Sequence, residues 1–571
     1  MNAILAVLLG LSALASAQNP APRQPGQVAP RPAPTVDPNA KPAGVIRGRI
    51  LVANGRPARR ASVRMMQWPD GGIPRVVSAD LDGRYEFTEV AADDYRISAG
   101  KPGYLALEYG QQRPFEHGKL VTIRNGETLE KIDIALPGSG AISGRVVDEH
   151  GDPVEGIDVR LMQSQFGSNR RQLVQTAGVG RRVTDDRGQY RLYGVSPGRY
   201  FVLASIADQP GPQPGAPTSV ILPSGYAPTY YPGTARASDT RLVTVGLAEE
   251  ADGIDIALAR VPTARISGTV VDSTGKPQRA GILVSTSQRS GALGAEPLRT
   301  SSSADGTFEV RNVPPGEWVL QVVSGGVSQG QEGEFASRFF TVNGVDVTDV
   351  RLQTSIGSRV EGRIMFEGSG TGDPTGVTIT TFPSDFDRAP IIGPGGRAAG
   401  RPDGTFVLEG LNGPRRLRLT RAPDTWSLKA IRVNGADVTD EPMPFGTKDE
   451  SLTNVEIVLT NRAASISGSV TDARGQTVTN YTVVVFATNA ERWYQASRFL
   501  RFSLPKADGT FAAPDLPPGE YYLAAVDRMQ GAEAFGEWQD PAFLESIAPR
   551  ATRLTLSDGQ AASVTTRLIV R

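Results

Sequence analysis

The chain has 571 residues, which allows about three to six domains of ordinary size. Its 60 Lys and Arg residues balance its 60 Asp and Glu residues, so the net charge gives no indication of nucleic acid as a partner. Cysteine is absent and only two histidines are present, which excludes disulfides, thiolate zinc sites, cysteine nucleophiles and most histidine-based catalysis. Abundant glycine (64) and proline (43) favour a turn-rich all-β protein over a helical bundle.

The first segment in chain order has the features of an export signal. Residues 4–14 form an apolar run, and the small residues Ala-Ser-Ala follow it at 15–17. This arrangement predicts a signal peptide over residues 1–17, cleaved after Ala17, and therefore a secreted or periplasmic protein. Residues 18–44 are rich in proline and lack core residues, which predicts an extended linker. No later stretch has the ~18 apolar residues of a membrane helix, so we expect no transmembrane anchor.

A strand pattern with a central glycine then occurs five times along the chain. Apolar residues flank the glycine at period two, which predicts a β-strand. A glycine inside a strand predicts that another backbone or a large side chain comes close to it. In copies one, two, three and five a glycine-containing turn follows the strand. The five strand glycines are Gly48, Gly144, Gly268, Gly362 and Gly468.

Two further signatures follow each opening strand. The first is an Asp and Gly turn that leads into a strand with an inward aromatic residue. The second is a Pro-Gly turn before a strand with one core face, found in copies two, three and five. Copy one keeps the spacing at Tyr95 without Pro-Gly, and copy four has Leu417, displaced by one residue. The inward aromatics of the first signature are Tyr85, Tyr190, Phe308, Phe406 and Phe511, and the aromatics after Pro-Gly are Tyr200, Trp318 and Tyr521.

The spacing of the opening strands indicates the fold. Their glycines are about 94 to 124 residues apart, whereas solenoid repeats run about 20–50 residues. We therefore predict an all-β protein of five tandem β-sandwich domains after the signal peptide and linker. Their predicted ranges are 45–140, 141–264 with a Tyr-rich insertion, 265–358, 359–464, which is degenerate, and 465–571.

The combined pattern resembles the carboxypeptidase regulatory-like domain. It reads Ile-Ser-Gly-x-Val-x-Asp, then Asp-x-x-Gly-x-Tyr, then Pro-Gly-x-Tyr-x-Leu-x-Ala, over nearly all of residues 45–571. The resemblance implies a transthyretin-like, prealbumin-type or Ig-like β-sandwich, related to the B-type repeats of bacterial surface adhesins. In metallocarboxypeptidases this module accompanies a zinc peptidase domain with a His-x-x-Glu pair, which neither His117 nor His150 supplies. We therefore expect a protein that is not an enzyme, with no cofactor, no catalytic residue and no metal site.

The Tyr-rich insertion of the second unit is the strongest candidate for a ligand or partner surface. Tyr226, Tyr230 and Tyr231 lie within six residues, and flat amphipathic rings suit interfaces. The pattern predicts a stacking platform for sugars or for a partner's peptide. The alternative is that this loop folds over its own sandwich and the tyrosines fill the end of the barrel.

Two charged features, an arginine-rich insertion and the turn aspartates, each allow two interpretations. The insertion over residues 164–182 carries four arginines and predicts a mobile basic loop or simply a solvated run of charge. The turn aspartates could bind calcium, best at Asp148 with Asp185 and Asp186. The favoured alternative is that each turn aspartate accepts hydrogen bonds from its own backbone.

The function is predicted less specifically than the fold. The pattern favours an exported, non-enzymatic protein of a bacterial envelope, acting as a structural spacer or rod or as a protein-interaction or adhesion module. The alternative is a carbohydrate-binding protein similar to starch-binding folds. The expected partner is an envelope protein or a glycan. Four tryptophans outside the repeat signature are freer to bind a partner, although packing is expected for each: Trp68, Trp426, Trp493 and Trp538.

Overall fold

Five β-sandwiches follow one another along the chain. The computed structural model describes residues 43–68, 73–111, 114, 118–167, 170–176, 178–180, 182–206, 226–287, 297–324, 333–390, 396–446, 450–506, 508–527 and 536–570. The longest helix in this part is α2 (Pro541–Ile547), with seven residues. The all-β class and the five tandem sandwiches are therefore confirmed. The predicted signal peptide, and the linker up to residue 42, lie outside the described residues.

The opening strands begin within a residue or so of the positions that the sequence pattern indicates. Whether each sandwich folds by itself stays a prediction. The opening strands are β1 (Gly44–Val52), β10 (Gly140–Val147), β20 (Ala264–Val271), β27 (Ser358–Glu367) and β35 (Ala464–Thr471).

One sheet of each sandwich is built around the opening strand, which lies between an antiparallel and a parallel neighbour. In the fifth sandwich the parallel neighbour also pairs with the second sheet, so the two sheets are continuous. The antiparallel neighbours are β4 (Arg84–Val90), β14 (Gln189–Val195), β23 (Thr307–Val313), β30 (Thr405–Leu411) and β38 (Thr510–Leu516). The parallel neighbours are β8 (Thr128–Leu129) with β9 (Ile134–Leu136), β18 (Glu250–Ala251) with β19 (Ile256–Ala257), β26 (Val347–Gln353), β34 (Leu452–Thr460) and β41 (Ala561–Ile569).

The second sheets face these strands across five separate hydrophobic cores. Alternation of buried and exposed residues along the strands supplies one core face to each sheet. The first three sandwiches have β2 (Ser62–Trp68), β3 (Arg75–Ser78), β5 (Asp93–Gly100), β6 (Leu107–Glu108) and β7 (Val121–Ile123); β11 (Ile157–Gly167), β12 (Arg170–Gln175), β13 (Arg182–Val183), β15 (Gly198–Ile206), β16 (Thr229–Tyr230) and β17 (Val243–Val245); and β21 (Gly281–Thr286), β22 (Leu298–Ser301), β24 (Gly316–Ser324) and β25 (Glu334–Val342). The last two have β28 (Thr378–Pro383), β29 (Arg397–Ala399) and β31 (Arg415–Arg421), with β32 (Ser427–Val433) and β33 (Ala436–Asp437) beside β34; and β36 (Thr482–Ala487), β37 (Leu500–Ser503), β39 (Gly519–Val526) and β40 (Thr552–Leu556).

The central glycine of each opening strand lies against a carbonyl group of the segment that runs parallel to it. A Cβ atom at Gly144 would overlap with the carbonyl oxygen of Ile254. The same overlap occurs in all five sandwiches, so no side chain fits at this position. The predicted close approach is confirmed, and it is an approach of backbone to backbone. The other four carbonyls belong to Ile132, Val350, Val455 and Val564.

Whether the aromatic residue of the first signature is tyrosine or phenylalanine follows from whether the parallel strand is interrupted. In the first two sandwiches the strand breaks at Ile132 and Ile254, and the hydroxyls of Tyr85 and Tyr190 donate to these two carbonyls at 2.6 Å. Burial raises the pKa of both hydroxyls, so they stay protonated donors. In the other three sandwiches β26, β34 and β41 continue through this position, and the aromatic is phenylalanine. The tyrosine therefore satisfies a carbonyl exposed by the break.

The polar group of the second-signature aromatic donates a hydrogen bond to a nearby backbone carbonyl. Tyr200 donates to the carbonyl of Ser196 at 2.6 Å, and three other sandwiches have the same bond to the residue four positions earlier. In the fourth sandwich the sequence predicts Leu417 at the position of this aromatic residue, but the structure places Arg415 there. The backbone of Arg415 pairs with that of Met443. The residue is 1% exposed, and its guanidinium donates to the carbonyl of Asn412 at 2.7 Å. A buried guanidinium thus replaces the aromatic ring.

We predict that Gly268→Ala destabilises the third sandwich by about 1–3 kcal/mol, because the new Cβ atom displaces the carbonyl of Val350. Gly281→Ala in the same sandwich is the control, since its Cβ atom would lie 3.7 Å from the nearest described atom, the Val323 oxygen. Hydrogen exchange of peptides from β20 and β21, measured on the full chain, is expected to accelerate in the first variant only. Equal exchange rates in both variants would contradict the role of the glycine.

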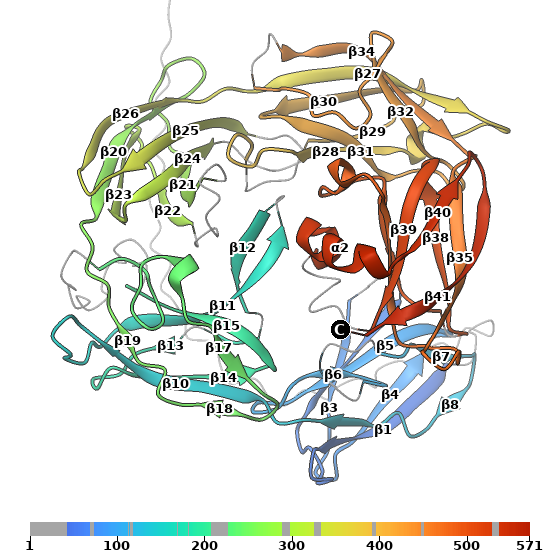
Figure 1. Cartoon of the computed structure of the whole chain (residues 1–571), viewed down its shortest axis with the longest axis horizontal. Helices are drawn as coiled ribbons and strands as arrows, with labels where there is room; N and C mark the ends of the chain where they lie inside the picture. Colours follow the sequence, from blue (N-terminus) through green and yellow to red (C-terminus); the bar gives the residue numbers. More distant parts are fainter. Residues whose placement is uncertain are drawn as a thin grey trace, which may run out of the picture.

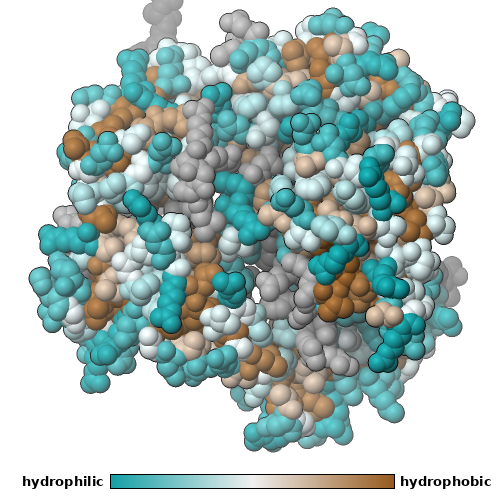
Figure 2. Space-filling model, in the orientation of Figure 1, coloured by the Kyte–Doolittle hydropathy of each residue, from teal (hydrophilic) through white to brown (hydrophobic). Residues whose placement is uncertain are grey.

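The five sandwiches are arranged in a ring rather than in an extended rod (Figure 1). The path runs from β1 through β10, β20 and β27 to β35, and β12 and α2 both lie toward the middle of the view. On the face shown in Figure 2, hydrophilic and hydrophobic residues are interspersed, with no single broad hydrophobic area. The compact arrangement does not fit the expectation of a rod.

The arginine-rich insertion of the second sandwich connects several members of this ring. It pairs β11 with β12, so the described part of the predicted mobile loop is ordered strand, and that expectation is wrong there. Arg170 donates to the carbonyl of Thr286 in the third sandwich at 2.9 Å. Arg171 forms an ion pair of 2.7 Å with Asp540, the N-cap residue of α2 in the fifth sandwich. We call the β11–β12 pair the central hairpin.

The contact between the central hairpin and the fifth sandwich is predicted to hold the ring closed. Arg171→Glu places a second negative charge beside Asp540, whose side chain is 8% exposed. The chain has no cysteine, so spin labels at Gln175→Cys and Glu545→Cys would be the only ones. We expect a narrow distance distribution in the parent and a broader one with Arg171→Glu. The same charge change at exposed Arg187 is the control, and broadening by both variants or by neither would contradict the prediction.

Candidate binding pocket between the fourth and fifth sandwiches

A pocket of about 470 Å³ lies where the fourth sandwich meets the fifth. We call it the 4/5 pocket. Its walls come from two units with separate cores, so their relative placement determines its shape. The fourth sandwich contributes Phe382, Arg418, Leu419, Thr420, Arg421, Ala422, Trp426, Ser427 and Leu428, and the fifth contributes Ala496, Ser497, Arg498, Leu500, Arg501, Phe502, Asp515 and Trp538.

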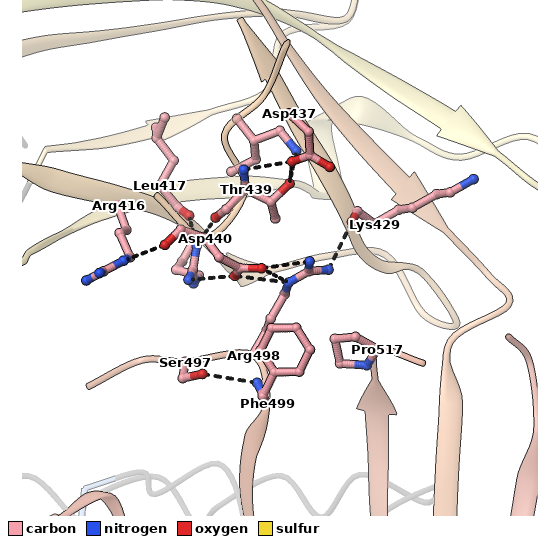
Figure 3. Close-up of polar contacts among 12 residues, drawn as sticks. Arg416, Leu417, Lys429, Asp437, Thr439, Asp440, Ser497, Arg498, Phe499 and Pro517 are labelled. Atoms are coloured by element: carbon pink, nitrogen blue, oxygen red, sulfur yellow. Dashed lines mark hydrogen bonds and ion pairs between the residues drawn. The ribbon is translucent and has the colours of Figure 1, made fainter. Parts of the chain in front are cut away.

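An ionic network fixes the two sandwiches beside the pocket (Figure 3). Asp440 of the fourth sandwich forms an ion pair with Arg498 of the fifth, with Nη2 and Oδ2 2.9 Å apart. Its other oxygen lies 3.3 Å from Nη2 of Arg418. Two guanidinium groups therefore share one carboxylate, which leaves an excess of positive charge at this junction.

Arg418 is buried and is held by hydrogen bonds to both sandwiches. It is 5% exposed and donates to the carbonyls of Leu417 at 2.8 Å and Thr439 at 2.7 Å. Across the junction it donates to the carbonyl of Ala496 at 3.0 Å and to the hydroxyl of Tyr494 at 2.9 Å. Burial lowers the pKa of Arg418, because taking the charged guanidinium out of water costs free energy. The hydrogen bonds to Leu417, Thr439, Ala496 and Tyr494 offset part of this cost.

Two other arginines of the pocket form no ion pair within the described residues, although the charge of Asp515 favours the protonated form of Arg501. Arg501 donates to the carbonyls of Leu500 at 2.9 Å and Asp515 at 3.0 Å. Burial lowers the pKa of its guanidinium. Arg421, at the end of β31, is exposed. These two cations are the groups that remain available to a negatively charged ligand.

Aromatic side chains form the apolar part of the pocket wall. Phe502, which is 37% exposed, lies against Trp538 with ring centroids 5.1 Å apart. Trp426 is 8% exposed and meets Phe366 edge to face at 4.8 Å. Phe502 and Trp538 therefore offer contact surface, whereas Trp426 is a core residue.

The tryptophans outside the repeat signature have different roles. Trp538 lies in the turn η6 (Glu537–Gln539) and lines the pocket beside Phe502, whereas Trp426 lines it as a buried core residue. Trp493 donates to the carbonyl of Ala487 at 2.7 Å and is packed, as expected. Trp68 lies under Arg96, with the guanidinium 4.1 Å from the ring centroid. The sequence marks these residues as unusual but contains no signal that brings Trp538 to Arg421.

The tyrosines of the second sandwich do not form a platform of three exposed rings. Tyr230 is 2% exposed and packs against Met162 and Leu203. Tyr226 and Tyr231 are partly buried against the core of the same sandwich, and the Tyr226 hydroxyl donates to Glu149. Tyr230 thus follows the alternative expectation of a core role. A ligand surface at Tyr226 and Tyr231 stays a prediction.

The turn aspartates accept hydrogen bonds from their own backbones, as favoured from the sequence. Oδ1 of Asp185 accepts from the amides of Arg187 and Gln189, and Asp148 makes the equivalent pair of bonds. In the part of the chain that the structure describes, no group of three His, Asp or Glu side chains is placed to hold a metal ion. None of the described helices is long and apolar enough to cross a membrane.

Three turn aspartates predict an acid-dependent stability. Thr307, Thr405 and Thr510 each donate through the hydroxyl and the amide to an aspartate two residues earlier, and these bonds lower the aspartate pKa below 3.8. A lowered pKa in the folded state adds stability above the unfolded pKa, and this stability is lost as pH falls through the folded value. We expect replacement of all three threonines by valine to lower the midpoint of urea unfolding at pH 6. The difference from the parent should shrink by pH 2, and an equal difference at both pH values would contradict the assignment.

A comparison with protein families supports the assignment of the first sandwich. Residues 45–137 match the model of the carboxypeptidase regulatory-like domain. The first sandwich is therefore similar to this family over its whole described length. The resemblance drawn from the repeat pattern is thereby confirmed. The other four units share the signatures and the placement of the opening strand between an antiparallel and a parallel neighbour.

Other comparisons show distant likeness. No curated protein matches the chain. The Streptococcal ancillary pilin is 13% identical, with 55% of this chain and 98% of that chain covered and a TM-score of 0.18. The minor pilin GBS52 of Streptococcus agalactiae is 13% identical, with coverage of 39% and 98% and a TM-score of 0.21. The hydroxyquinol 1,2-dioxygenase of Pseudomonas putida DLL-E4 is 12% identical, with coverage of 17% and 57% and a TM-score of 0.13.

Proposed function

We propose that this chain is an exported, non-catalytic interaction protein of a bacterial envelope, and that it binds its partner in the 4/5 pocket. The observation that carries the proposal is the composition of the pocket at a junction of two sandwiches. Guanidinium groups and aromatic rings gather there from residues that the repeated fold does not require. Binding residues are expected where the scaffold leaves the sequence free to vary.

The chemistry of the lining supports binding rather than catalysis. Arginine keeps its proton at any physiological pH, so it supplies charge and hydrogen bonds but does not exchange protons with a substrate. The family that matches residues 45–137 is named for a regulatory-like module, which agrees with a non-catalytic role. The apolar run at residues 4–14 supports export.

The ring arrangement favours an interaction module over a spacer. A spacer separates its two ends, and five sandwiches joined end to end would do this best. In Figure 1 the path instead turns back on itself, and the fifth sandwich is tied to the second by Arg171 and Asp540. The carbohydrate-binding alternative has weaker support, because one of the three tyrosines proposed for stacking is buried.

Arrays of peptides and of glycans, probed with the full chain, test the proposed function. We expect bound probes whose signal falls at least about tenfold with Trp538→Ala, since aromatic contact area is lost. Trp68→Ala in the first sandwich is the matched control and is expected to keep the signal. Retention of all binding by Trp538→Ala would place the site elsewhere, and loss in both variants would indicate a general effect on the fold.

A further inference from the structure

The strands that form the 4/5 pocket are both edge strands. Within the described sheets, β31 is the last strand of the order β29-β28-β31, and β37 is the first of the order β37-β36-β39. An edge strand presents amide and carbonyl groups that no neighbouring strand pairs. Leu419, Thr420 and Arg421 of β31 line the pocket, as do Leu500, Arg501 and Phe502 of β37. The pocket thus contains backbone able to pair with an additional extended chain.

Part of this edge is already occupied, which locates the available stretch. The amide and carbonyl of Arg415 pair with the backbone of Met443, and the carbonyl of Leu417 accepts from the side chain of Arg418. On the other wall, the carbonyl of Leu500 accepts from Arg501. The C-terminal end of β31, residues 419–421, is therefore the segment open to an added strand, and it accommodates only a short one.

The charges around this segment specify the sign of the ligand. Four arginines and one aspartate, Asp515, line the pocket, and Asp440 beside it is shared by Arg418 and Arg498. Arg421 and Arg501 are the two that form no ion pair among the described residues. A ligand carboxylate beside them would form charge-assisted hydrogen bonds in a partly desolvated site.

The opposite wall selects an apolar or aromatic side chain. Phe502 and Trp538 lie together and Phe502 is partly exposed. In an extended chain, neighbouring side chains point to opposite faces. An acidic residue directly followed by an aromatic residue could therefore direct one side chain to each wall.

We propose that the 4/5 pocket binds a short, extended, acidic peptide segment of a partner protein. Its backbone pairs with β31 at residues 419–421, its carboxylates meet Arg421 and Arg501, and its aromatic side chains pack on Phe502 and Trp538. Such strand addition gains affinity from the main chain and specificity from alternate side chains. This proposal rests on the proposed function and adds the class of partner.

The test uses a fluorescein-labelled heptapeptide of alternating Glu and Phe, with a matched peptide of alternating Lys and Phe. Fluorescence anisotropy of the full chain is expected to show binding of the acidic peptide at least about tenfold tighter. Arg421→Glu should remove this preference. Arg397→Glu is the control, because Arg397 is an exposed arginine on β29, at the opposite edge of the same three-stranded sheet.

A second probe tests strand pairing separately from charge. The same acidic peptide, methylated on alternate backbone amides, keeps its side chains but cannot donate the ladder hydrogen bonds on that side, so we expect at least about a tenfold loss of affinity. Equal affinity of the methylated peptide, or of the acidic and basic peptides, would overturn the proposal. Loss of binding with Arg397→Glu as well would also overturn it. If the arrays detect a ligand sensitive to Trp538→Ala while the acidic peptide fails, the proposed function stands and the partner class is wrong.

Discussion

Every sandwich depends on the contact between the glycine of its opening strand and a carbonyl of the parallel strand beside it. This contact lets the first and last strands of one sandwich lie side by side in one sheet, which closes the unit on itself. A side chain at Gly362 would overlap with the carbonyl of Val455 and also with the ring of Phe406. The glycine, the adjacent backbone and the inward aromatic are therefore selected together, and this explains why the three signatures recur with fixed spacing.

Once each sandwich is closed, the remaining freedom lies at its edges and in its insertions. The central hairpin extends two strands of the second sandwich beyond its own core, where Arg170 and Arg171 meet the third and fifth. The junction of the fourth and fifth uses Asp440 in the same way. An isolated exposed ion pair contributes only about 0–1 kcal/mol, so packing and hydrogen bonds must act with these charges.

The sequence predicts the fold well and the pocket poorly, for a physical reason. Strand alternation, turn glycines and core aromatics are local patterns, and their repetition in five copies makes them recognisable in the sequence. The replacement of an aromatic ring by Arg415 violates the usual rule that charge is exposed, so the sequence alone pointed to Leu417. The pocket joins Arg421 to Arg501 and Trp538, which share no spacing and belong to different cores. The central hairpin carries arginines that a sequence reading assigns to solvent.

The turn that carries Trp538 is held from two sides. Asp540, which follows it, pairs with Arg171 of the central hairpin, and Gln539 accepts from the amide of Ala496 in the pocket wall at 3.0 Å. A Cβ atom at Gly536 would lie 2.9 Å from the carbonyl of Phe166 in the hairpin. The position of Trp538 in the pocket wall is therefore supported by the central hairpin as well as by the fifth sandwich. The second sandwich contributes no residue to the pocket lining, yet its Arg171 helps to hold one wall of the pocket in place.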